Sequence, residues 1–139
     1  MNKFYSSFII LFLTSTLFLN ATTSLSSNSE LIKIVKQQQY LAKKISKYYG
    51  DFQADKRNIK KKELMKKSIK SFHSNHLKLI KNRNNTQVIN QKLTKVDKIW
   101  KIADKLSQTQ KHDKMLNTAM NDISGEMEEL KKLYTKITK

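Results

Sequence analysis

Residues 37–49 read Gln-Gln-Gln-Tyr-Leu-Ala-Lys-Lys-Ile-Ser-Lys-Tyr-Tyr. Within this stretch Leu41 and Ile45 lie four residues apart, a spacing that places them on one face of an α-helix. The same spacing continues on both sides and predicts a helix over 29–52. Gln38 falls on the apolar face of this helix, where a plain bundle helix carries an apolar side chain. The stretch therefore predicts both a packed helix and a polar group inside it.

Three further segments repeat this apolar spacing. The chain has no proline and two glycines, and it lacks the alternation typical of strands. Apolar residues at steps of three and four predict helices over 58–80, 86–107 and 111–137. For the second helix the expected core positions are Met65, Ile69, Phe72 or His73, His76 or Leu77, and Ile80. Because each helix must cover one apolar face and the connections are short, the sequence predicts an all-α, up-down-up-down four-helix bundle over 29–139.

The N-terminal segment has the features of a secretory signal peptide. Lys3 supplies a positive charge, residues 8–19 are mostly apolar, and Ala21 offers a small residue for cleavage. The apolar run is about 12 residues long, whereas a membrane span needs about 20, so a retained anchor is the weaker interpretation. We expect a signal peptide over 1–21, a polar linker over 22–28, and a periplasmic or secreted location.

The chain is strongly basic, with 28 Lys and Arg against 11 Asp and Glu and a net charge of +17. Such a charge often indicates a polyanionic partner. Only Arg57 and Arg83 are arginines, however, and specific phosphate recognition favours arginine over lysine. The charge is therefore interpreted mainly as a lysine-rich solvated surface, and we expect no nucleic-acid partner for an exported chain.

Catalytic and cofactor signatures are missing from the sequence. There is no Cys, which excludes disulfides, thiolate metal sites and covalent haem attachment. There is no glycine-rich phosphate loop and no Ser-His-Asp set in a motif context. The sequence therefore predicts a protein that is not an enzyme and that carries no cofactor.

Two histidines, His73 and His76, lie three residues apart in the second predicted helix and are weak candidates for metal ligands. A metal site needs further ligands, so ordinary imidazoles are the favoured interpretation. A metal or haem carrier that uses these histidines with methionine sulfurs is the minor alternative. The candidate sulfur donors are Met115, Met120 and Met127.

Gln38 and its neighbours have two interpretations. A buried amide needs hydrogen-bond partners, so Gln38 either bonds a partner in the bundle or reaches its surface, or else it faces a ligand or a second subunit. The stretch 37–49 resembles the first helix of the type IV pili methyl-accepting chemotaxis transducer N-terminal domain. This PilJ-like family includes the sensor domain of NarX-type nitrate and nitrite kinases. The positions that match the family are Gln38, Leu41, Ile45, Lys47 and Tyr49, with Phe72, Leu79, Val96 and Trp100 downstream.

The resemblance implies a sensory binding module. Gln37 and Gln39 stand where the family has arginines, so any anion would need its charge from Lys36, Lys43 or Lys44. We expect an exported ligand-binding bundle that binds a small anion near Gln38, Gln39, Lys43 and Lys36, or that contacts a membrane receptor or kinase. The family also implies a homodimer across the first helix. The alternative function is a structural or adhesion bundle whose lysine-rich face binds acidic envelope polymers.

Overall fold

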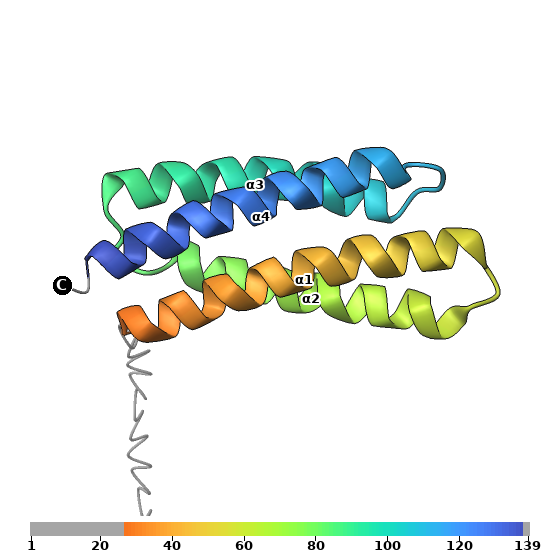
Figure 1. Cartoon of the computed structure of the whole chain (residues 1–139), viewed down its shortest axis with the longest axis horizontal. Coiled ribbons are helices and arrows are strands. Elements are labelled where there is room, and N and C mark those ends of the chain that lie inside the picture. The colour runs from red at the N-terminus through yellow and green to blue at the C-terminus, as the bar shows by residue number, and fades with distance from the viewer. Residues whose placement is uncertain (1–26, 138–139) are drawn as a thin grey trace, which may run out of the picture.

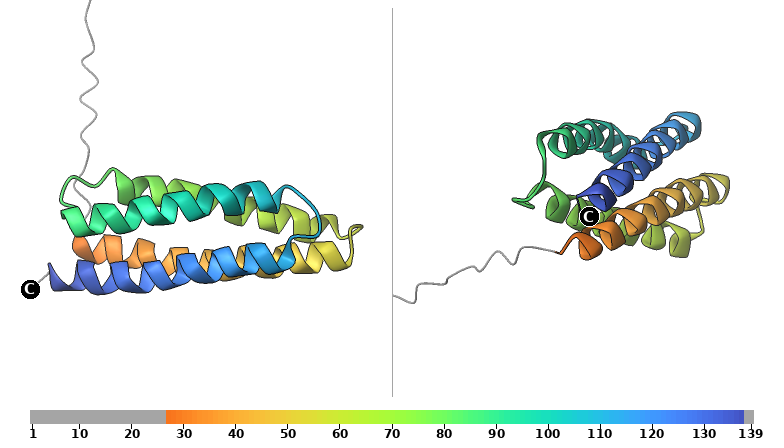
Figure 2. Two further views of the ribbon diagram at one scale, coloured as in Figure 1. Left: turned by 90° about the horizontal axis from the view of Figure 1, so that it is seen from above. Right: turned by 60° about the vertical axis from the view of Figure 1, so that its left-hand side comes forward.

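The computed structural model describes residues 27–137, which form four α-helices joined by short loops (Figure 1). The helices are α1 (Asn28–Ala54), α2 (Ile59–Ile80), α3 (Gln87–Ser107) and α4 (Asp113–Lys136). Successive helices run in opposite directions and pack side by side (Figure 2). The predicted all-α, up-down-up-down bundle is confirmed. The predicted signal peptide over 1–21 lies outside the described residues.

Side-chain caps fix where the first three helices begin. The capping residues are Ser27, Asn58 and Thr86, which accept hydrogen bonds from the backbone N–H groups of Glu30, Lys61 and Ile89. Each cap satisfies one of the donors that a helix leaves unpaired at its first turn. The first helix thus begins one residue earlier than predicted. The fourth begins later than predicted, because Lys111 has a φ of 65°, which no right-handed helix accommodates.

The core runs the length of the bundle and draws on all four helices. On α2 the predicted core face was partly wrong, because Leu77 and Ile80 are 37% and 40% exposed. Leu79 is fully buried instead, in line with Met65 and Phe72 at steps of seven. The buried face of α2 is therefore turned slightly from the predicted one, and it includes polar groups that the apolar pattern did not mark.

The four helices do not pack equally. Helix α1 packs extensively against α2 and α4, and α3 packs against α4, whereas α2 and α3 make far fewer contacts. A stacked ring pair bridges this weak side: the Phe72 and Trp100 centroids lie 4.2 Å apart at an interplanar angle of 27°. Trp100 is 4% exposed and belongs to the core.

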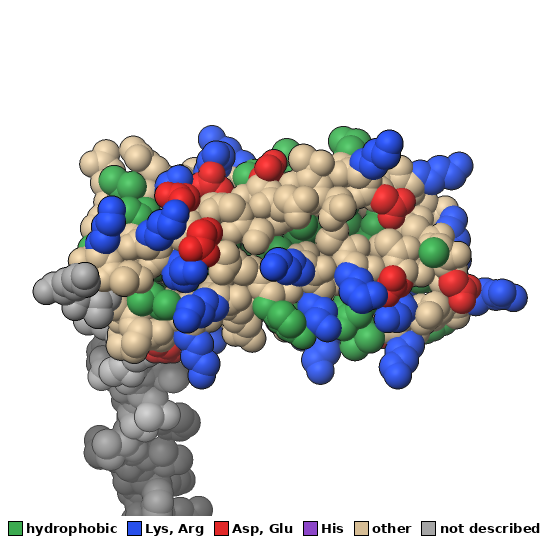
Figure 3. Space-filling view, in the orientation of Figure 1, with side chains coloured by type: hydrophobic (Ala, Val, Ile, Leu, Met, Phe, Trp, Pro, Cys, Tyr) green, Lys and Arg blue, Asp and Glu red, His purple; other side chains and the backbone are tan. Residues whose placement is uncertain are grey.

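The surface is rich in lysine, with acidic side chains interspersed among them (Figure 3). Glu126 of α4 receives two α3 lysines, Lys92 at 3.1 Å and Lys95 at 2.6 Å. Burial alone would raise the pKa of the Glu126 carboxyl, but hydrogen bonds from Lys95 and Lys92 outweigh it, and the pKa is lowered. These ion pairs join α3 to α4.

Among residues 27–137 no helix combines the length and the apolar character that a membrane span requires.

Two tyrosine hydroxyls hold loops of the bundle at opposite ends. Tyr49 of α1 donates to the Thr109 carbonyl at 2.9 Å and accepts from the His112 N–H at 3.1 Å. Helix α4 has no side-chain cap at its start, and the Tyr49 hydroxyl holds the backbone N–H of His112, the residue that precedes the helix. At the other end Tyr134 of α4 donates to Asn85 Oδ1 at 2.8 Å. Each hydroxyl therefore ties one helix to a loop that is distant in sequence.

Replacing Gly125 tests whether α4 is a regular, unstrained helix at its middle. A Cβ added there meets no heavy atom within 4 Å. Because glycine loses more backbone freedom on folding than alanine, Gly125→Ala should raise the free energy of unfolding by about 0.5–1 kcal/mol. Urea unfolding measures this, with the buried Ile123→Ala as a destabilised comparison. A lower midpoint for Gly125→Ala would contradict a regular helix at this position.

Candidate functional site

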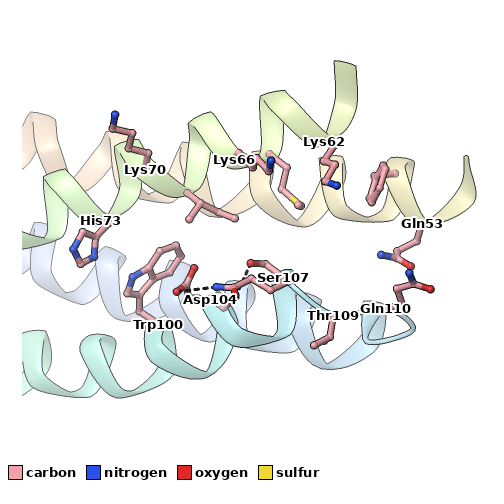
Figure 4. Close-up of a pocket in the computed structure, with 14 residues that line it drawn as sticks. Gln53, Lys62, Lys66, Lys70, His73, Trp100, Asp104, Ser107, Thr109 and Gln110 are labelled. Carbon is pink, nitrogen blue, oxygen red and sulfur yellow. Dashed lines mark hydrogen bonds between the residues drawn. The ribbon is translucent and has the colours of Figure 1, made fainter. Parts of the chain in front are cut away.

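A cleft of about 750 Å³ opens between α2 and α3, on the side of the bundle where the helices pack least (Figure 4). We call it the α2–α3 cleft. Residues 62–73 of α2 and 100–107 of α3 form its two walls, and loop residues 108–110 close one end together with Phe52 and Gln53 of α1. Its volume falls in the range of about 300–1,000 Å³ that small-molecule sites occupy.

The floor of the cleft is apolar. Met65, Ile69 and Trp100 line it, and Met65 and Trp100 belong to the core. Phe72 stacks on Trp100 from within the bundle. Figure 4 shows Trp100 reaching from α3 toward α2, next to His73. The cleft therefore exposes part of the same aromatic layer that joins the two helices.

The α2 wall carries most of the charge. Lys62, Lys66 and Lys70 recur every four residues along it, with His73 at its inner end. Lys62 Nζ lies 5.5 Å from the centre of the Phe52 ring, a cation–π contact. Figure 4 shows Lys70 turned away from α3. Lys62 and Lys66 are therefore the two lysines best placed to meet a ligand.

The α3 wall and the loop end are polar. Asp104 is the acidic residue among those that line the cleft. Its carbonyl accepts the Ser107 hydroxyl at 2.7 Å, and Gln108 Nε2 lies 3.5 Å from its carboxylate. Thr109 is held in place by the Tyr49 hydroxyl. The loop wall thus offers hydrogen-bonding groups whose position depends on α1.

Tyr49→Phe should loosen this loop wall. The substitution removes two hydrogen bonds to backbone from a residue that is 1% exposed, so we expect a loss of about 1–2 kcal/mol in the free energy of unfolding. Faster amide hydrogen exchange in residues 108–112 would report the local effect. Tyr48→Phe is the matched control, because the Tyr48 hydroxyl accepts a hydrogen bond from the Lys44 side chain one turn away on the same helix. Equal stability of the two variants would contradict this bracing role.

Gln38, the central residue of the predicted site, lies in the core and is fully buried. Its Nε2 donates to the Phe72 carbonyl at 3.1 Å. Of the two interpretations drawn from the sequence, the structure therefore shows the partner within the bundle. Gln38 Oε1 has no hydrogen-bond partner among the described residues.

The other three predicted site residues, Lys36, Gln39 and Lys43, lie on a different face of α1 from the buried Gln38. Lys36 and Lys43 are exposed, and both share a helix face with Gln39 by their spacing of three, four and seven residues. Gln39 Nε2 donates to the Ser124 carbonyl at 3.3 Å and to the Glu128 carboxylate at 3.1 Å. The structure therefore brings Lys36, Gln39 and Lys43 to one face. On that face the side-chain amide of Gln39 already donates a hydrogen bond to the carboxylate of Glu128.

The two histidines are in different environments. His73 is exposed and lines the cleft, whereas His76 is 1% exposed and stacks on Phe72 with ring centroids 6.1 Å apart. His76 Nε2 lies 3.9 Å from Asp97 Oδ1, a neighbour on α3 that the sequence did not suggest. Within residues 27–137 no group of three or more His, Cys, Asp and Glu side chains is arranged to hold a metal ion.

His76 makes the stability of the bundle depend on pH. Burial lowers its pKa from 6.5 to about 4, although Asp97 acts in the opposite direction. Between these values the unfolded chain binds a proton that the folded chain does not, so stability falls as the pH drops from 6.5 to 4. A pKa unit corresponds to about 1.4 kcal/mol, so the expected loss is roughly 3 kcal/mol.

Replacing His76 tests this pH dependence. His76→Leu should remove most of the loss between pH 6.5 and 4, because the unfolded chain then has no imidazole at this position to protonate. Urea unfolding at several pH values measures the slope in both proteins. The same slope in the variant and the parent would show that other groups control the acid sensitivity.

The sequence did not predict the cleft. A signal was present in the lysines that recur every four residues beside Met65 and Ile69 on α2. The opposite wall comes from a helix that follows in sequence yet packs only loosely against α2.

No family model, no curated protein and no solved structure matches this chain, so its resemblance to PilJ-like and NarX-like sensor domains stays a prediction from its sequence.

Proposed function

We propose that this protein is an exported ligand-binding module of the sensory type and that its ligand occupies the α2–α3 cleft. The observation that carries the proposal is the cleft itself, which combines a volume of about 750 Å³, an apolar floor and several polar side chains at its walls. Sites of this kind are where small molecules bind most often. A small anion remains the expected ligand class, because lysines line one wall.

The position of the cleft supports a sensory role. Helices α2 and α3 make few contacts with each other, so a ligand that touches both adds a link across the weakest side of the bundle. Binding would then favour one separation of the two helices over others. A membrane receptor, a kinase or a second copy of the chain would respond to this change in helix separation, in keeping with the family that the sequence resembles.

The second candidate function is a structural or adhesion bundle that binds acidic envelope polymers. The net charge of +17 and the lysines spread over the surface favour it. Such binding depends on many exposed charges and should collapse as ionic strength rises. Binding in a cleft with an apolar floor should change much less with salt.

A thermal-shift screen on residues 22–139 tests the proposal. The panel holds nitrate, nitrite, other small anions, amino acids and divalent metals at constant ionic strength. A ligand at about 100 times its Kd should stabilise the bundle by roughly 2.7 kcal/mol, a shift of several degrees in Tm.

Two variants locate the binding site. His73→Trp fills the inner end of the cleft and should abolish the shift, because His73 lines the cleft. Ser74→Trp adds the same side chain at an exposed neighbour that does not line the cleft, and it should keep the shift. A shift that persists in His73→Trp would place the site elsewhere. A binding partner that is lost at high salt would favour the polymer-binding alternative.

A further inference from the structure

Resting on the proposed function, we infer that the α2–α3 cleft selects a planar aromatic acid: a flat apolar ring system that carries one negatively charged group. The ring would lie on the floor formed by Met65, Ile69 and Trp100, and the charged group would face Lys62 and Lys66. This inference names a ligand class that differs from inorganic anions such as nitrate, and it places the ligand away from the α1 face.

The floor favours a flat apolar group. One face of Trp100 is covered by Phe72, with centroids 4.2 Å apart, and the ring reaches into the cleft (Figure 4). Trp100 is 4% exposed, so a ligand would meet a narrow aromatic edge flanked by Met65 and Ile69. Aromatic edges and methionine sulfur both pack favourably against aromatic rings. An inorganic anion would leave this floor uncovered.

The walls favour a negative charge. Three lysines line the α2 side, against the single carboxylate of Asp104 on the α3 side. Lys66 Nζ lies 3.5 Å from Glu63, but both side chains are well exposed, so this pair contributes little and Lys66 is available to a ligand. Lys62 is held over the Phe52 ring at the same wall. A cationic ligand would face these lysines, with Asp104 as its one acidic partner in the cleft lining.

The charge lies beside the apolar floor, along one wall. Lys62 and Lys66 are one helical turn apart, on the same helix as Met65 and Ile69. A rigid acid can therefore place its ring on the floor and its carboxylate at the wall at once. The loop end of the cleft, where Gln53, Thr109 and Gln110 lie, offers amide and hydroxyl groups to any polar substituent.

Matched probes separate charge from shape. The probes are 2-naphthoate, its neutral analogue 2-naphthamide and the flexible acid octanoate, each titrated calorimetrically into residues 22–139. Trp100 is the only tryptophan in the chain, so its fluorescence reports binding at the cleft itself. We expect 2-naphthoate to bind about tenfold more tightly than either of the other two probes, because each of them loses one of the two recognised features.

A pair of double variants locates the charge. Lys62→Gln with Lys66→Gln should weaken 2-naphthoate binding by about fivefold to tenfold and leave 2-naphthamide unchanged, as expected for the loss of two partly exposed ion pairs. Lys67→Gln with Lys78→Gln removes the same charge from exposed positions of α2 that do not line the cleft and should leave both affinities unchanged. Equal weakening by both double variants would overturn the inference, because net charge alone would then explain it.

The remaining outcomes distinguish this inference from the proposed function. If 2-naphthamide or octanoate binds as tightly as 2-naphthoate and His73→Trp abolishes binding, the cleft is a ligand site but the aromatic-acid inference is wrong. If no probe binds and no ligand in the screen depends on His73, both fail. A dimer that dissociates in His73→Trp would show that a second copy fills the cleft, which also overturns the inference.

Discussion

Phe72 connects three of the four helices. Its backbone carbonyl accepts the buried Gln38 amide from α1, and its ring stacks on Trp100 of α3. Because α2 and α3 otherwise make few contacts, this ring pair sets how closely they approach at the middle of the bundle. Toward the α3–α4 loop the two helices leave the cleft between them. Both the position and the aromatic floor of the cleft therefore depend on Phe72.

The layer around Phe72 is also the most polar part of the core. Buried side-chain atoms without a hydrogen-bond partner among the described residues include Gln38 Oε1, Asn75 Nδ2 and both ring nitrogens of His76. Each such group costs about 1–3 kcal/mol relative to a paired one. The imidazole of His76 lies in the same layer, so protonation at low pH should weaken the packing where α2 meets α3.

Periodicity predicted the helices and the bundle, because these depend on residues three and four apart in one helix. It misplaced Leu77 and Ile80, since two neighbouring faces of α2 both carry apolar residues and packing selects between them. It left Gln38 between two interpretations, because its partner is a carbonyl on another helix. The spacing of α2 carried a signal for one wall of the cleft, but the cleft itself depends on the distance between helices, which no spacing within one helix encodes.

The hydroxyl of Tyr49 has a consequence for the order in which the molecule assembles. Its two bonds join residues 60 and 63 positions apart, from the first helix to the last loop. Contacts of such long separation form late, because a large loop of chain must close before they are made. The loop wall of the cleft is therefore completed only when the two helical hairpins dock. A partly folded chain, even one with all four helices formed, would have no complete cleft.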